Sequence, residues 1–124
     1  MTTTYAVLFP GDEKGWADAS AEDRARVYGL HGEFMRLLAE RGHTMTGGAE
    51  LTHSSQAKVI RGTLDQVSVT EGPYAETVEQ LTGFYLVDTD NLDDLLNICG
   101  LLSDGEPIEV RACVAPEQQS GSDA

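Results

Sequence analysis

The stretch that reveals the fold covers residues 83–102 and reads GFYLVDTDNLDDLLNICGLL. Its first seven residues are mostly apolar, with aromatic and β-branched side chains, which is typical of a buried strand. Beyond Asn91, apolar residues recur at helical spacing at positions 92, 95, 96, 99 and 102. Asp90 can cap this helix, and Asp93 and Asp94 favour the positive end of its dipole. This half of the chain therefore predicts a strand followed directly by an amphipathic helix.

The N-terminal half repeats this order of elements. Residues 5–9 form an apolar run that predicts a buried strand, and residues 12–19 predict a polar loop. Ser20 can then cap a helix whose apolar residues fall on one face. Arg41 and the glycine after it are typical of a helix end, where a cation suits the dipole and glycine stops the chain.

Four further segments lie between and after these halves. Residues 45–51 contain two adjacent glycines and predict an irregular strand. Residues 57–61 and 66–70 predict a β-hairpin with a loop of about four residues. A helical turn is expected over residues 75–81, after the chain break at Gly72-Pro73. The last strand is predicted over residues 108–114.

The resulting order is strand, helix, strands, then strand, helix, strand. It predicts an α+β ferredoxin-like plait, with an antiparallel sheet and two helices on one face. Neighbouring residues of a strand point to opposite faces, yet Ala6 and Val7, like Phe84 and Tyr85, are all apolar. A bare apolar face is unusual in a soluble monomer. We therefore expect a two-fold homodimer that buries this face; the alternative is that the Trp16 loop or the hairpin covers it.

Length and composition limit the kinds of protein that this chain can be. A chain of 124 residues fits one domain, expected over residues 1–114, with a disordered tail over residues 115–124. With 8 Lys plus Arg against 21 Asp plus Glu, the net charge of −13 argues against nucleic acid and anionic membranes as partners. There is no spanning apolar run. A basic leader is also missing, so we expect the cytoplasm.

Residues 71–87, EGPYAETVEQLTGFYLV, resemble a known family. They match the hallmark run DGPFAETKEQLGGYYLI of the YCII-related, DGPF-type proteins, and weaker agreement extends over roughly residues 4–114. The resemblance implies a dimeric α+β barrel, in which two plaits join through their sheets. It implies little about activity, because members are mostly uncharacterised. Many are encoded beside alternative sigma factors. Muconolactone-isomerase-type enzymes share the architecture, but their activity is only an analogy, because fold does not fix function.

Three departures from the family's hallmark bear on chemistry. Glu71 replaces the usual Asp and keeps the charge on a longer arm, and Tyr74 replaces Phe and adds a phenol that can donate a hydrogen bond. Val78 replaces Lys, which weakens the case for a lysine acid or anion clamp.

The turn at Pro73 has a structural and a functional interpretation. It can simply shape the backbone before a strand. It can also present Glu71, Tyr74, Glu76 and Glu79 at the mouth of a cleft in the dimer. Carboxylates that share a partly buried site can serve as acid or base. On this hypothesis Glu76 is catalytic and the other three residues bind ligand.

The histidines are the natural acid–base groups near neutral pH. His31 borders the apolar face of the first helix and is either a half-buried structural residue or a proton carrier. His53 lies in a polar stretch and either belongs to a plain loop or lines the pocket with Glu50. His43 follows a helix end, where it is structural or exposed.

Other chemistry has weaker support in the sequence. Arg111 on the last strand is expected to pair with Glu109 or with a carboxylate ligand. There is no Cys-x-x-Cys or His-Glu-x-x-His spacing, so we expect no metal and no cofactor. Cys99 belongs to the apolar face of its helix and should be inert. Cys99 and Cys113 do not make a disulfide framework.

Three functions remain open. The leading interpretation is a protein that binds a small organic metabolite in a cleft of the dimer. A cofactor-independent isomerase, lyase or cyclase that uses His31, His53 or Glu76 for proton transfer is the second. The third is a regulatory interaction module linked to an alternative sigma factor.

Overall fold

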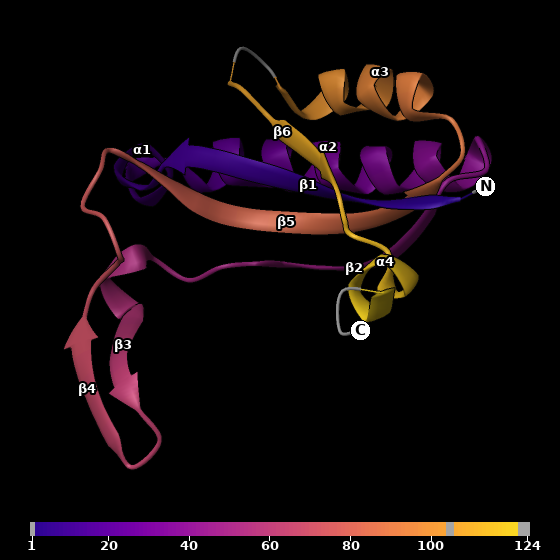
Figure 1. The fold of residues 1–124 in the computed structure, drawn as a ribbon. Helices are drawn as coiled ribbons and strands as arrows, with labels where there is room; N and C mark the ends of the chain where they lie inside the picture. Colours follow the sequence, from indigo (N-terminus) through magenta and orange to yellow (C-terminus); the bar gives the residue numbers. More distant parts are fainter. Residues whose placement is uncertain (1, 104–105, 122–124) are drawn as a thin grey trace.

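The computed structural model describes residues 2–103 and 106–121 and confirms the α+β ferredoxin-like fold. Its main sheet is antiparallel and has four strands in the order β2-β5-β1-β6. The strands are β1 (Thr3–Asp12), β2 (Thr44–Glu50), β5 (Glu79–Thr89) and β6 (Glu109–Ala112). Helices α2 (Ala21–Glu40) and α3 (Leu92–Ser103) lie on one side of this sheet (Figure 1).

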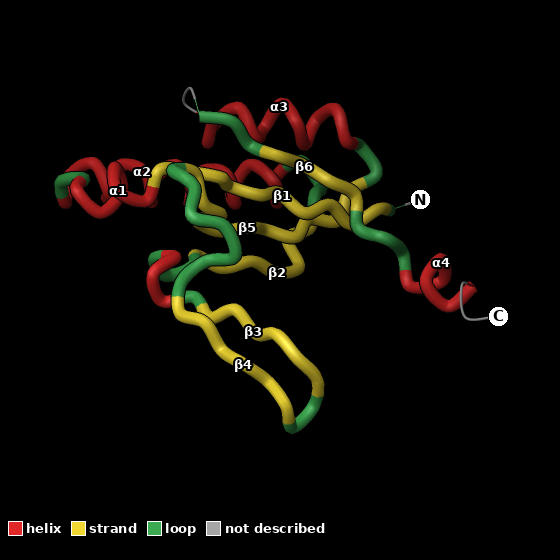
Figure 2. The backbone as a smooth tube through the Cα atoms, turned by 60° about the vertical axis from the view of Figure 1, so that its left-hand side comes forward, coloured by secondary structure: helices red, strands yellow, loops and turns green. Residues whose placement is uncertain are grey.

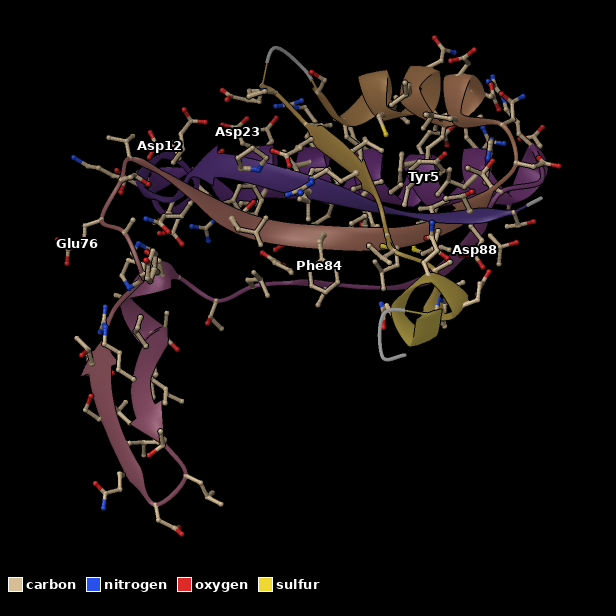
Figure 3. The ribbon with its side chains drawn as sticks, viewed as in Figure 1. Tyr5, Asp12, Asp23, Glu76, Phe84 and Asp88 are labelled. Carbon is tan, nitrogen blue, oxygen red and sulfur yellow. The ribbon has the colours of Figure 1, made fainter. Side chains whose placement is uncertain are left out.

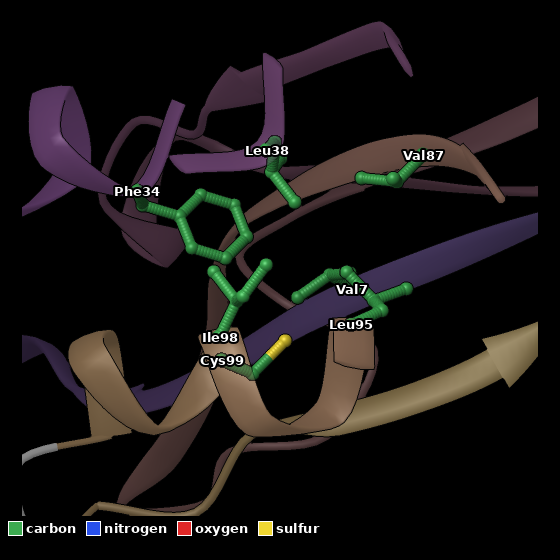
Figure 4. Close-up of a cluster of buried hydrophobic side chains, with 7 residues drawn as sticks. All are labelled: Val7, Phe34, Leu38, Val87, Leu95, Ile98 and Cys99. Carbon is green, nitrogen blue, oxygen red and sulfur yellow. The ribbon is translucent and has the colours of Figure 1, made fainter. Parts of the chain in front are cut away.

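The hydrophobic core lies between the two helices and the sheet. Seven side chains form it, contributed by the central strands and both helices (Figure 4): Val7, Phe34, Leu38, Val87, Leu95, Ile98 and Cys99. Full burial of one such side chain stabilises the fold by roughly 1.5–3 kcal/mol. The predicted apolar face is confirmed in α2, whereas in α3 the exposed Leu96 was wrongly placed on it and the buried Ile98 was missed. Burial also raises the pKa of the Cys99 thiol to about 11, which keeps it protonated.

Both ends of α2 follow their sequence signals. Ser20 Oγ accepts a hydrogen bond from the backbone N of Asp23 at 3.0 Å, as expected of an N-cap. Past the C-terminus, Gly42 has φ +85°, a conformation that favours glycine.

His43 is structural and buried. Its Nδ1 lies 2.7 Å from Thr89 Oγ1, and its Nε2 lies 2.7 Å from Asp94 Oδ2. The hydrogen bond from His43 lowers the pKa of the Asp94 carboxyl, and Arg41 adds to the effect. These bonds tie the end of α2 to the first turn of α3.

The loop expected over residues 12–19 is a short helix, α1 (Glu13–Asp18). Asp12 caps it, with Oδ1 accepting from the backbone N of Lys14 at 3.0 Å. Arg24 of α2 donates from Nη2 to the carbonyl oxygens of Trp16 at 3.0 Å and Ala17 at 2.7 Å. The helix was missed because these tertiary bonds hold a turn too short and too polar to show helical periodicity.

The predicted hairpin is confirmed as β3 (Lys58–Thr63) and β4 (Gln66–Glu71), and it projects away from the main sheet (Figure 2). Its loop is shorter than expected, since Thr63 pairs with Gln66. Two residues make the turn, and Asp65 has φ +66° there. Aspartate tolerates this conformation better than most residues.

Two expectations near β5 are wrong. No helical turn forms over residues 75–81, because Glu79 and Gln80 pair with the end of β1 and extend β5. The cap of α3 is Asn91 rather than Asp90, with its Oδ1 accepting from the backbone N of Asp94 at 3.1 Å.

Two short helices complete the chain. One is the 3₁₀ turn η1 (Ser54–Gln56), and the other is α4 (Pro116–Gly121). Helix α4 falls within the predicted tail, whose residues 122–124 lie outside the described residues.

Candidate functional site

A cleft of about 920 Å³ lies beside the sheet within a single chain. Its walls come from β1, α1, residues 23–35 of α2, β2, residues 51–53 before η1, and β5. This volume lies in the range of small-molecule sites. Five aromatic side chains line it: Phe9, Trp16, Tyr28, Phe84 and Tyr85.

Tyr85 lies at the centre of the aromatic wall. Its ring meets Phe9 edge-on at 5.6 Å and stacks on Phe34 of the core at 5.6 Å between centroids. Gly48 of β2 lies beside Tyr85 on the neighbouring strand and has φ +145°. A Cβ at position 48 would lie 2.5 Å from the Phe84 carbonyl oxygen and 2.6 Å from the Tyr85 ring. Glycine therefore allows β2 to approach β5 where the cleft wall forms.

His31 and Tyr85 form a polar pair in this wall. His31 Nδ1 lies 2.8 Å from Tyr85 Oη. Burial lowers the pKa of His31, against a smaller raising effect of Glu50, and burial raises the pKa of Tyr85. Both groups are therefore uncharged at neutral pH. The phenol can donate to Nδ1, which leaves the imidazole proton on Nε2.

Glu50 and Tyr28 form a second pair. The Tyr28 hydroxyl lies 3.1 Å from Glu50 Oε1 and 3.2 Å from Oε2. The bond to this carboxylate raises the pKa of the Tyr28 phenol. Trp16 packs edge-on against Tyr28 at 5.6 Å. A carboxylate thus lies against Tyr28, which in turn packs against Trp16, at the lining of the cleft.

Glu13 joins α1 to the segment through η1. Its Oε2 accepts from the backbone N of Ser54 at 2.7 Å, and its Oε1 accepts from the Ser54 hydroxyl. His53 Nε2 lies 3.8 Å from Glu13 Oε1, while His53 Nδ1 accepts from the backbone N of Ser55 at 3.1 Å. His53 is therefore both the cap of η1 and part of the cleft lining.

The cleft brings together three of the residues singled out from the sequence: His31, Glu50 and His53. The five others lie outside this cleft. Glu71 pairs with Lys58 Nζ at 2.8 Å at the base of the hairpin, and Arg111 Nε lies 3.8 Å from Glu109 Oε2. Tyr74 and Glu76 are exposed in the segment that leads into β5, and Glu79 is exposed at the first residue of β5. Figure 3 shows Glu76 on this segment, apart from the sheet.

Several lining residues were missed in the sequence. Tyr28 and Met35 lie three residues before and four after His31, so helical spacing places them on the same stripe of α2. That stripe could have been read from the sequence. Glu13 and Tyr85 gave no such signal, because their partners lie 41 and 54 positions away.

Two further findings concern metals and membranes. Among residues 2–103 and 106–121, no group of three or more His, Cys, Asp or Glu side chains is placed to hold a metal ion. No helix within the same ranges has both the length and the apolar character needed to span a bilayer.

The fold and the cleft define a class: a ferredoxin-like α+β protein with an aromatic, small-molecule-sized cavity beside its sheet. The sequence profile of the YCII-related domain matches residues 4–100, and the chain belongs to this family. An uncharacterised protein of Rhizobium meliloti (strain 1021) is 36% identical over 103 residues, which cover 83% of this chain and 82% of the relative. The resemblance drawn from residues 71–87 is therefore confirmed.

Proposed function

We propose that this YCII-related protein binds a small organic metabolite in the cleft beside its sheet. The observation that carries the proposal is the convergence of His31, Glu50 and His53 on one cavity of about 920 Å³ with aromatic walls. Small-molecule sites typically combine an apolar lining with a few polar groups that orient the ligand. These three side chains come from α2, the end of β2 and the cap of η1, so the fold itself gathers them.

The proposal includes a homodimer formed through the open face of the sheet. Opposite the helices, Ala6 pairs with Leu86 and Leu8 pairs with Phe84, which makes a continuous apolar surface. Figure 3 shows Phe84 on this side of β5. Phe84 also lines the cleft. A second copy on this face would therefore lie against the cavity and help to enclose it.

A thermal-unfolding screen of the full chain against a metabolite library tests the binding proposal. A ligand at 100 times its Kd should raise the free energy of unfolding by about 2.7 kcal/mol. The same ligand should stabilise a His31→Ala, Glu50→Gln double variant far less. Glu22→Gln, an exposed change on the same helix as His31, is the control and should respond like the wild type. A library that stabilises neither protein contradicts the proposal, as does equal stabilisation of the double variant.

A cofactor-independent isomerase, lyase or cyclase is the second candidate, and the His31–Tyr85 pair favours it. A neutral imidazole whose Nδ1 is held by a phenol has its other nitrogen oriented for proton transfer. For any ligand found, product formation distinguishes the two functions. An enzyme should lose turnover in His31→Gln but keep ligand-dependent stabilisation, whereas a binding protein forms no product at all.

A further inference from the structure

Building on the proposed function, we propose that the cleft selects an organic cation, namely a ligand with an ammonium group on an apolar body. The inference concerns the charge of the ligand. It rests on a carboxylate that no lysine or arginine of the described residues pairs with, on the aromatic rings of the cleft lining, and on the uncharged state of His31.

Glu50 supplies the negative charge. In the described part of the chain, the hydrogen bonds to its carboxylate come from the Tyr28 hydroxyl, and no lysine or arginine forms an ion pair with it. The Tyr28 phenol is itself neutral, since this bond raises its pKa. Most of the acceptor capacity of the Glu50 carboxylate therefore remains available to a ligand. Two other lining carboxylates are engaged: Asp12 caps α1, and Glu13 binds Ser54.

The aromatic rings supply the second component. Tyr28 binds Glu50, Trp16 packs on Tyr28, and Phe9 and Tyr85 continue the wall. The faces of aromatic rings attract cations, and sites for organic ammonium groups commonly combine such rings with a carboxylate. An anionic ligand would instead face repulsion from Glu50 and from the other lining carboxylates.

The positive side chains near the cleft do not offset this preference. Arg24 lies over the Trp16 ring at 5.6 Å, but its guanidinium donates to the carbonyls of α1 and is absent from the lining. Arg26 lines the cleft and already has a partner of its own. His31 is uncharged near neutral pH because burial lowers its pKa. The Nδ1 atom of His53 is occupied as the acceptor of the hydrogen bond from the Ser55 backbone N.

The test compares three probes of similar shape that differ in charge: phenethylamine, phenethyl alcohol and hydrocinnamate. Trp16 is the single tryptophan of the sequence and lines the cleft, so its fluorescence reports on binding in the full-length protein. We expect phenethylamine to bind about tenfold more tightly than the alcohol, and hydrocinnamate more weakly than both.

Glu50→Gln assigns the preference to the carboxylate while preserving shape and hydrogen bonding. We expect this variant to bind phenethylamine and phenethyl alcohol equally, whereas the matched control Glu22→Gln keeps the preference. Equal affinities in the wild type, tighter binding of hydrocinnamate, no binding of any probe, or a preference that survives in Glu50→Gln would each overturn the inference. The proposed function fails separately, when the metabolite library yields no ligand of any charge.

Discussion

Two histidines, the half-buried His31 and the buried His43, each give this protein a property that depends on a single residue. Burial lowers the pKa of His31 below its ordinary 6.5, so the unfolded chain takes up this proton more readily than the folded protein. The stability that neutral His31 provides is complete above about pH 6.5 and is lost as the pH falls through its folded pKa. Urea unfolding at a series of pH values should show a steeper loss of stability toward pH 5 in the wild type than in His31→Gln. Parallel curves would contradict this.

His43 should contribute to the stability of the fold through its hydrogen bonds to Thr89 and Asp94, and not through its packing alone. Removing it in His43→Ala leaves Thr89 and Asp94 without their buried partner, which should lower the free energy of unfolding by about 1–3 kcal/mol. Thr89→Val breaks the same network from the other side. Since the residues share one hydrogen bond, the double variant should lose less than the sum of the two single losses. Strict additivity in chemical denaturation would show that the bond contributes nothing.

The edge strand β2 depends on a glycine because it must pass close to β5. Gly48→Ala forces a Cβ against the Phe84 carbonyl and the Tyr85 ring, and φ +145° strains any other residue. We expect a loss of more than about 1 kcal/mol in stability, together with weaker ligand binding as the Tyr85 ring is displaced. Gly32→Ala in α2 is the control. There a Cβ meets nothing within 4 Å, and the change should stabilise the helix by about 0.5–1 kcal/mol.

The whole molecule should be a dimer if the open face of the sheet is buried against a second copy. Sedimentation at micromolar concentration should then give about twice the 13.4 kDa of one chain. Leu86→Glu places a charge in the middle of the apolar face beside Ala6 and should give folded single chains, as judged by circular dichroism. Leu96→Glu adds the same charge on the exposed side of α3 and should leave the mass unchanged. A wild-type mass of one chain would contradict the dimer.

Much of the architecture could be predicted from the sequence because its signals are local. Helical spacing identified the faces of α2 and α3, apolar runs identified the central strands, and Ser20 marked a helix start. The two errors in secondary structure, at residues 12–19 and 75–81, fall where contacts between distant segments decide the conformation. Hydrogen bonds from Arg24 stabilise α1 where a loop was predicted. Pairing with β1 makes residues 79–81 part of β5 where a helical turn was predicted.

The candidate site was only partly foreseeable for the same reason. His31, Glu50 and His53 could be named from residue type, but not the partners that give them their chemistry. Tyr85 and Glu13 reach His31 and Ser54 across 54 and 41 positions of chain. Hydrophobic periodicity along the chain was enough to determine the order of elements and the buried faces, because each element must turn its apolar side toward the core. Only the packing of β2, β5, α1 and α2 decided which polar groups share a cavity, since contacts between distant segments leave no periodic trace in the chain.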